Sequence, residues 1–417
     1  MNRIVSREPR WSRRIDVWPC AGLAVRSPTQ RLRALLLAAA AVVVPLATSG
    51  CSASDDGTAE TPRPTPAPGN ETPATTVDPG GDPVAQACAA ETAGLQAGLD
   101  RARDADTSAV LAVKNPDCGV RVLTSGPAKL TGTELHRIGS VTKTYVAAVV
   151  LTLAQEGALG LDDAVSTWVA GVPNGDVITL RQLLNHTSGL FNYTEDKPFL
   201  TEAVTKDHAW SPRALLDVAF KHPPYAAPGE QWHYSNTNYI LLGLVGEAAG
   251  RANIGELVRS RVLAPIGAKA TFFDGVEPVT GELALGTDAR GNDMRKVGPS
   301  WAWAAGAMLA SPADVVTWTE KLGSGAFYTV AMQEEVTRGV RTPEATMSYG
   351  LGMMILDSRA TGGAGTAYGH AGDTPGYHTQ AFYFKAAKTT IVSIVDSDAA
   401  PANDITVAAL AVLSSKK

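Results

Sequence analysis

The fold is decided by the stretch Ser140-Val-Thr-Lys-Thr-Tyr-Val-Ala-Ala-Val-Val-Leu-Thr-Leu-Ala-Gln-Glu156, in which a serine and a lysine precede a long apolar run. The run predicts a helix that is apolar on most of its circumference and is therefore buried between layers. Residues three apart share one face of a helix, so the Lys143 amine can lie against the Ser140 oxygen. The helix dipole and burial both disfavour a protonated lysine here, and a neutral amine can accept the serine proton. The pair therefore predicts an activated serine nucleophile.

Two further polar clusters follow along the chain, Tyr234-Ser-Asn236 and His370-Ala-Gly372. Each alone has an ordinary structural explanation, the first as a polar helix entry and the second as a turn before a strand. A serine and a lysine three apart also occur by chance, as they do at Ser414 and Lys417. Whether Ser140 and Lys143 are catalytic must therefore be judged from the presence of all three clusters and from their order along the chain.

The first 50 residues have the composition of an export signal. Residues 1–33 carry eight arginines, and the apolar stretch 34–47 is too short to span a bilayer comfortably but fits the core of a secretory signal. The small residues from Thr48 to Cys51 resemble the cleavage box of bacterial lipoproteins, in which Cys51 becomes the lipidated first residue. Thr48 stands where leucine is usual, so cleavage without a lipid is the alternative. We expect a lipoprotein at the outer face of the cytoplasmic membrane, or a secreted protein.

Residues 51–87 are rich in Pro, Thr, Ala, Asp and Gly, which predicts a disordered tether ahead of a folded domain at 88–417. Loss of residues 1–50 would remove eight positive and two negative charges, and would take the net charge from −5 to −11. An acidic chain without a basic stripe argues against nucleic acid as a partner. A start codon downstream of Met1 would explain the long basic segment equally well.

Two cysteines, Cys88 and Cys118, lie in the expected folded domain, whereas Cys20 and Cys51 belong to the export region. In an exported protein such a pair most often forms a disulfide, here one that closes a loop of about 30 residues. Free buried thiols are the alternative.

Apolar patterns along the folded domain predict strands at both ends and helices between them. The predicted elements are a hairpin at 108–114 and 119–125 with its turn at 115–118, strands at 380–384 and 389–395, and a closing helix at 404–413. Ser311-Pro-Ala-Asp314 is a capped helix start. Residues 160–260 are expected to be mostly helical. One sheet built from both ends of the domain, around a helical insert, is the arrangement that this order favours.

Together, Ser140-x-x-Lys143, Tyr234-Ser-Asn236 and His370-Ala-Gly372 resemble the motifs of the penicillin-recognising serine hydrolases, a family that includes D-alanyl-D-alanine carboxypeptidases and class C β-lactamases. The likeness covers about residues 105–413. It extends through Arg137 to Lys143, Leu183 to Leu190, Phe191 to Tyr193 and Tyr234 to Tyr239. It implies an α/β fold class, in the form of an α+β sandwich: an antiparallel sheet flanked by helices, with a helical subdomain inserted at about 160–260.

The resemblance also implies acyl transfer through a covalent intermediate. Ser140 would attack a carbonyl, Lys143 and Tyr234 would share the general-base and general-acid duties, and Asn236 would hold the substrate amide. Which of lysine and tyrosine is the base stays open, because coupled groups titrate as a unit. His370 would line the site opposite Tyr234 and help keep Tyr234 or Lys143 in its reactive protonation state. No metal or cofactor is implied.

The backbone N–H groups of Ser140 and Asp373 would form the oxyanion hole, with Ala371 and Gly372 beside Asp373 in the substrate-binding site. In the carboxypeptidase branch, the positions of Ala371 and Asp373 are typically threonines that help to hold the carboxylate of D-Ala-D-Ala. An Asp373 side chain pointing at that pocket would repel a carboxylate by about 1 kcal/mol at 4 Å in water, and more when partly desolvated. The sequence assigns no arginine to the pocket, Arg338 and Arg341 being only candidates.

Several substrates therefore stay open. The expected partner is a small peptide, amide or ester, with the peptidoglycan stem peptide as one candidate, and a monomer is expected. If Asp373 faces a substrate ammonium, an amidase or aminopeptidase acting on D-amino-acid derivatives is favoured. An esterase is the neutral option, and a β-lactamase would need efficient deacylation. A non-catalytic wall-binding lipoprotein is the alternative from another class.

Because Ala371 and Asp373 replace the two threonines, we expect poor release of C-terminal D-alanine and weak capture of β-lactams. A fluorescent penicillin should label the protein slowly, and Asp373→Thr should restore labelling. Rapid stoichiometric labelling of the unaltered protein would contradict the prediction.

Overall fold

The computed structural model describes residues 82–206 and 208–415. The predicted signal at 1–50, Cys51 and nearly all of the tether at 51–87 lie outside the described residues. From Val84 onward the described chain belongs to one compact unit. Within the described part, the apolar helices are all too short or too polar to cross a bilayer.

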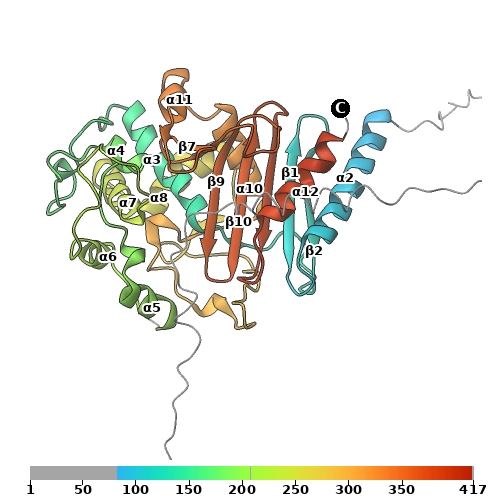
Figure 1. Cartoon of the computed structure of the whole chain (residues 1–417), viewed down its shortest axis with the longest axis horizontal. Helices are drawn as coiled ribbons and strands as arrows, with labels where there is room; N and C mark the ends of the chain where they lie inside the picture. Colours follow the sequence, from blue (N-terminus) through green and yellow to red (C-terminus); the bar gives the residue numbers. More distant parts are fainter. Residues whose placement is uncertain (1–81, 207, 416–417) are drawn as a thin grey trace, which may run out of the picture. The chain divides into compact units, whose positions relative to one another are not determined.

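An eight-stranded antiparallel sheet runs through this unit in the order β2-β1-β11-β10-β9-β8-β7-β6 (Figure 1). Its strands are β1 (Ala109–Asn115), β2 (Gly119–Ser125), β6 (Val340–Arg341), β7 (Met347–Tyr349), β8 (Met354–Leu356), β9 (Ala367–Thr374), β10 (Tyr377–Phe384) and β11 (Thr389–Val395). A smaller sheet joins β3 (His136–Arg137), β5 (Met308–Ala310) and β4 (Thr271–Phe273). Because β1 pairs directly with β11, with Ala109 opposite Val395, both ends of the unit build one sheet. The predicted fold class is confirmed.

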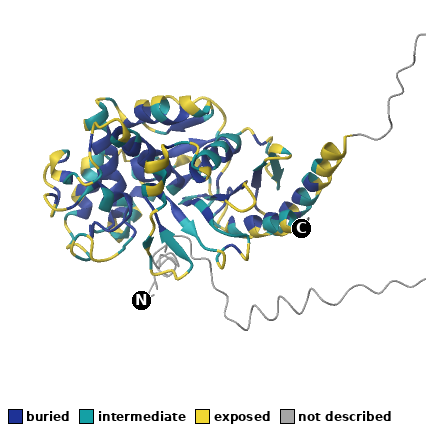
Figure 2. Cartoon of the chain, turned by 90° about the horizontal axis from the view of Figure 1, so that it is seen from above, coloured by how far each residue is buried: buried dark blue, intermediate teal, exposed yellow. Residues whose placement is uncertain are grey.

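Strand β1 is buried on both faces, which explains its continuous apolar sequence. Alternate residues of a strand point to opposite faces. Leu111 belongs to the hydrophobic cluster that contains Leu95 of α2 and Ile405 of α12, whereas Ala112 belongs to the larger cluster around α3 and α10. The sheet is therefore the middle layer between two sets of helices, and Figure 2 shows the buried residues gathered along the strands and inside the helical part.

The outer helices on one side are α2 (Pro83–Ala102) and α12 (Asn403–Ser414), which come from the two ends of the unit. They pack closely because α2 presents glycines to its neighbour: a Cβ atom at Gly94 would lie 3.1 Å from Val412 Cγ1. The other face carries α3 (Thr142–Gln155) and α10 (Pro312–Ser324), whose predicted cap Ser311 accepts a hydrogen bond from Asp314 N–H.

The helical part lies between α3 and α10. Its helices are α4 (Leu180–Leu184), α5 (Lys197–Thr205), α6 (Pro212–Ala219), α7 (Asn236–Gly250), α8 (Ile254–Val258) and α9 (Ala264–Ile266), and α11 (Val330–Thr337) follows α10. Helix α4 begins with a capping box between Thr179 and Gln182. Helix α7 is buried along most of its length and packs against α3, so the helical part and the nucleophile share one core.

Two local interpretations of the sequence differ from the structure. Helix α2 begins at Pro83, five residues before the expected start of the folded domain, because its apolar positions share a hydrophobic cluster with residues of β1 and α12, a contact that local composition does not reveal. His370–Asp373, expected as a turn, lies within strand β9, and the turn to β10 is Pro375-Gly376, with Gly376 at φ +82°.

Cys88 and Cys118 form a disulfide with a sequence separation of 30. It ties α2 to the turn between β1 and β2. Asn115, at the start of that turn, accepts a hydrogen bond from Cys118 N–H and donates one to Glu91 of α2. The bond therefore fixes the outer helix to the hairpin that it covers.

Removing this disulfide should lower the free energy of unfolding by about 3–4 kcal/mol, because a loop of about 30 residues gains entropy in the unfolded chain. The measurement is denaturant unfolding of residues 82–417 with Cys88→Ser and Cys118→Ser. The unaltered protein under reducing conditions is the matched control and should unfold at the same denaturant concentration. A loss below about 1 kcal/mol would show that the hairpin and α2 hold each other without the bond.

Candidate active site

Ser140 lies on a tight turn immediately before α3. The turn is the 3-10 helix η2 (Gly139–Val141), so the serine precedes the α-helix rather than opening it. Gly139 has φ +50°, and a Cβ atom there would lie 2.7 Å from the backbone nitrogen of Asp373. Only glycine permits both the conformation and this approach. The nucleophile candidate is therefore held at a point where the turn touches strand β9.

Lys143 and Tyr234 both reach the Ser140 hydroxyl. Lys143 Nζ donates to Ser140 Oγ at 2.9 Å and to the Ala305 carbonyl at 2.6 Å. Tyr234 Oη donates to Ser140 Oγ, also at 2.9 Å. The lysine side chain is fully buried, and its amine lies 5.0 Å from the centre of the Tyr234 ring and 5.5 Å from that of Tyr239. The structure thus brings together the three residues that the sequence predicts to carry the chemistry.

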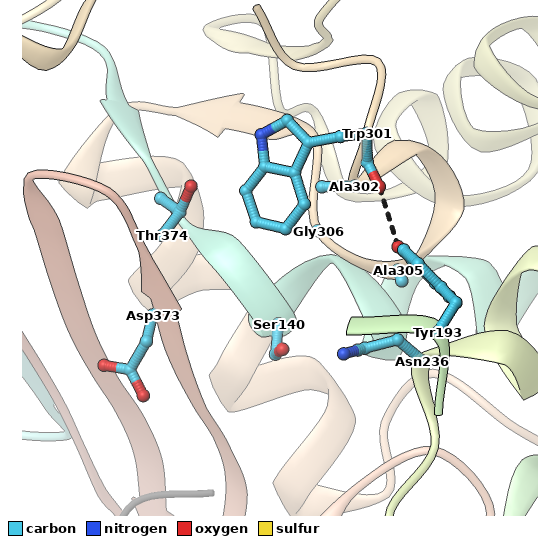
Figure 3. A pocket seen from close by; sticks show the side chains of 9 residues that line it. All are labelled: Ser140, Tyr193, Asn236, Trp301, Ala302, Ala305, Gly306, Asp373 and Thr374. Carbon is cyan, nitrogen blue, oxygen red and sulfur yellow. Dashed lines mark hydrogen bonds between the residues drawn. The ribbon is translucent and has the colours of Figure 1, made fainter. Parts of the chain in front are cut away.

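Asn236, the first residue of α7, faces the same pocket. Its backbone N–H donates to Asn192 Oδ1 at 3.0 Å, and its side-chain nitrogen donates to Thr194 Oγ1 at 2.9 Å. In Figure 3 the Asn236 amide points toward Ser140. The amide is therefore oriented by the loop before α5 and is placed to contact a bound carbonyl or amide.

Gly372 brings strand β9 against the serine turn. A Cβ atom at Gly372 would lie 2.0 Å from the Ile138 carbonyl oxygen and 3.1 Å from the backbone nitrogen of Ser140. Ser140 and Asp373 line one pocket as a result. The neighbouring Ala371 is buried, with 4% of its surface exposed, so a threonine hydroxyl at this position would not reach solvent without rearrangement.

His370 lies behind the pocket rather than in it. Its Nε2 is 2.8 Å from Tyr349 Oη, and its Nδ1 is bonded to the Ala371 carbonyl. Its ring centre is 6.3 Å from that of Tyr234, and the hydrogen bonds that the structure shows for it go to neither Tyr234 nor Lys143. Burial, together with the nearby Lys143 charge, lowers the pKa of His370 to about 3. His370 is therefore a neutral imidazole that faces the Tyr234 ring, while its hydrogen bonds go to Tyr349 and to the Ala371 carbonyl.

Asp373 lines the pocket with its backbone, but its side chain turns away. Figure 3 shows the carboxylate pointing away from Ser140. Asp373 Oδ1 lies 2.5 Å from His378 Nδ1, and His378 is the cross-strand neighbour on β10. The expectation that this carboxylate points at the substrate pocket is not what the structure shows, because a facing histidine holds it.

Sequence reasoning missed several residues of the site. Tyr193 and Trp301 line the pocket, and Tyr193 Oη donates to the Trp301 carbonyl at 2.8 Å. Burial raises the pKa of Tyr193 well above its ordinary value, so its hydroxyl stays a donor. Arg338 pairs with Glu335 on an exposed surface, and among the described residues neither Arg338 nor Arg341 lines the pocket.

His186 is a third missed residue. Its ring centre lies 4.3 Å from that of Tyr234 and 4.7 Å from that of Tyr349. It is fully buried, its Nδ1 accepts a hydrogen bond from Ser235 N–H, and burial lowers its pKa well below 6.5. Its backbone φ of +65° lies in the left-handed region, a strained conformation that often marks functional sites. The histidine therefore packs against the rings of Tyr234 and Tyr349.

These features define a serine hydrolase of the β-lactamase fold. The profile of the Beta-lactamase family matches residues 100–414, and the chain belongs to this family. Penicillin-binding protein 4* of Bacillus subtilis is 25% identical over 286 residues, which cover 63% of this chain and 61% of that protein. The chain spans about three fifths of the length of the curated relatives that it matches first.

Two solved structures show the same relationship. A D-stereospecific amidohydrolase from a Streptomyces species is 30% identical, with a TM-score of 0.67, over 76% of this chain and 97% of that one. A D-amino acid amidase from Ochrobactrum anthropi is 25% identical, with a TM-score of 0.70, over 78% of this chain and 99% of that one. The protein is thus related both to penicillin-binding proteins and to D-amino acid amidases.

The buried state of His370 predicts a pH dependence of stability. Below about pH 6.5 the unfolded chain binds a proton at this histidine that the folded protein binds only near pH 3, so the free energy of unfolding falls as the pH falls through this window. Relative to His370→Gln, the unaltered protein should lose up to about 2 kcal/mol between about pH 7 and pH 5, measured by denaturant unfolding.

His208 is exposed, and His208→Gln is the matched control, which should follow the unaltered protein. If the difference between His370→Gln and the unaltered protein is the same at both pH values, His370 is not held neutral.

Proposed function

We propose that the protein is a hydrolase that cleaves amide bonds of D-amino-acid derivatives through an acyl-enzyme on Ser140. The observation that carries this proposal is the position of the Ser140 hydroxyl, 2.9 Å from both the Lys143 amine and the Tyr234 hydroxyl. Two proton-transferring groups on one serine oxygen are what nucleophilic catalysis with general-base assistance requires.

In the proposed reaction, Ser140 Oγ attacks the substrate carbonyl carbon and gives its proton to the Lys143–Tyr234 pair. The carbon–nitrogen bond then breaks, and the pair returns the proton to the leaving amine. Water then attacks the resulting ester and loses a proton to the same pair. The bond between the acyl carbon and Ser140 Oγ breaks, and the pair returns its proton to Ser140 Oγ as the acid leaves. The Lys143 amine is fixed for this transfer, because it bonds the Ala305 carbonyl at 2.6 Å as well as Ser140 Oγ.

The charge that develops on the carbonyl oxygen would be stabilised by backbone N–H groups of Ser140 and Asp373. The close approach of Gly139 and Gly372 supports this assignment, because it places both backbones at one pocket. Each such donor contributes about 3–4 kcal/mol to transition-state stabilisation in serine hydrolases. Asn236 would hold the amide on the acyl side of the scissile bond.

The choice of substrate rests on charge. Among the described residues that line the pocket, Asp373 alone carries a charged side chain, and arginine and lysine are missing from this lining. A substrate with a free C-terminal carboxylate therefore finds no cationic partner there, whereas an amide or ester does not need one. The 30% identity to a D-stereospecific amidohydrolase supports the same preference.

A D,D-carboxypeptidase acting on cell-wall stem peptides is the second candidate. The observation that favours it is Thr374, which lines the pocket and could offer a hydroxyl to a carboxylate. Relatives named as penicillin-binding proteins support it too. For either substrate, we propose from the sequence alone that the protein is exported and held at the membrane by a lipid on Cys51.

A substrate panel tests these proposals. Residues 82–417 should hydrolyse D-aminoacyl amides in preference to their L enantiomers, with weaker activity on D-Ala-D-Ala peptides, short esters and nitrocefin. Ser140→Ala should lower kcat by at least about 10³-fold, because the nucleophile is lost. Mass spectrometry should detect a Ser140-dependent adduct with an activated acyl donor, and a lack of any adduct would instead favour a wall-binding protein without catalysis.

A further inference from the structure

The side chain of His378 lies between two carboxylates beside the pocket. Its Nδ1 is 2.5 Å from Asp373 Oδ1, and its Nε2 is 3.7 Å from Asp398 Oδ1. Asp398 is fixed in turn, because it accepts a hydrogen bond from Gly376 N–H in the β9–β10 turn at 2.7 Å. Only 13% of the His378 side chain is exposed. The His378 imidazole therefore has a fixed position at this edge of the site.

The charged groups around His378 are mostly acidic. Asp373 faces it from β9, Asp398 from the segment after β11, and Asp288 approaches Asp398 from the loop after β4, with Arg290 near Asp288. The cations Arg137 and Arg295 face Tyr377, the preceding residue, whose side chain points to the other side of the strand. Burial alone lowers the pKa of His378, but Asp373 and Asp398 outweigh this effect and raise it above 6.5.

The contact between His378 and Asp373 controls the charge near Ser140. Asp373 is the one charged side chain among the described residues of the pocket, and its carboxylate is turned toward His378. A protonated imidazole cancels the Asp373 charge and holds the carboxylate away. A neutral imidazole leaves a full negative charge at the pocket edge and binds the carboxylate less tightly.

We propose that His378 is a specificity-determining residue, which sets by its own protonation whether the pocket tolerates a carboxylate on the substrate. The inference rests on the proposed acyl transfer at Ser140. When His378 is protonated, substrates with a free carboxylate and those with a neutral amide are both accepted. When His378 is neutral, the uncompensated Asp373 selects against the carboxylate. The sign follows from the raised pKa, because discrimination against carboxylates increases as the pH rises through it.

The test uses two matched substrates, an N-acyl-D-alanyl-D-alanine peptide and its C-terminal amide. They differ only in one charge, which stays constant between about pH 5.5 and pH 9. The ratio of kcat/KM for the amide to that for the acid cancels every pH effect on Ser140, Lys143 and Tyr234. In the unaltered protein this ratio should rise about tenfold from the lower to the higher pH, as expected for one charge near the pocket edge.

Two variants test whether the change in this ratio comes from His378 and Asp373. With His378→Gln the ratio should be high and independent of pH, and with Asp373→Asn it should be low and independent of pH. The control is His222→Gln, which removes a histidine–aspartate pair of the same kind, with Asp196 at 2.9 Å, that does not line the pocket. This variant should keep the rise seen in the unaltered protein.

A flat ratio in the unaltered protein, or an unchanged rise in His378→Gln, would overturn the inference. If turnover is slow, the rates at which activated D-acyl donors with and without a carboxylate form the Ser140 adduct provide the same ratio. If an adduct forms but the ratio of the two rates does not change with pH, the role of His378 is contradicted and the proposed function is not. If no adduct forms with either donor, the proposed function fails, and the role of His378 fails with it.

Discussion

The site depends on how closely strand β9 passes the turn that holds Ser140. Gly139 and Gly372 face each other across this contact, and a side chain on either would collide with backbone atoms of the opposite segment. Their absence of side chains lets two backbones touch, so two amide groups have a fixed position relative to the nucleophile. Because the contact is made by the main chain, the side chains around it can differ without moving it. Substrate preference can therefore vary while the positions of Ser140 and the two backbone amide groups stay the same.

Much of the fold could be predicted because its elements have strong local patterns. The largely apolar α3, the continuous apolar run of β1 and the Pro-Asp turn of the first hairpin each follow from a short stretch of sequence. Helix α2 could not be predicted in the same way. Its buried residues, such as Leu95, contact α12 from the other end of the unit, and its start lies in a segment with the composition of a tether. The short strands β6 to β8 have two or three residues each, too few for a pattern to be recognised.

The site shows the same division between local and long-range information. Ser140, Lys143, Tyr234 and Asn236 belong to sequence motifs. In the structure Lys143 and Tyr234 bond the Ser140 hydroxyl, and Ser140 and Asn236 line one pocket. Tyr349 comes from β7 and reaches His370 only through the sheet, and no motif marks it. The direction of the Asp373 side chain depends on His378, and strand pairing rather than sequence spacing decides that contact. The motif residues of the site could be predicted from the sequence. The hydrogen-bond partners of His370 and Asp373 could not, because they depend on how the strands of the sheet are paired.

The pairing of β1 with β11 has a consequence for how the chain acquires its structure. These two strands are neighbours in the sheet but come from opposite ends of the unit, so the largest loop in the fold must close before they meet. During synthesis, β1 and β2 can form a hairpin early, but β1 keeps an unpaired edge until β11 emerges. Such an edge readily recruits other strands. The fold is consequently slow to complete, and its early intermediates are the species most in need of protection from aggregation.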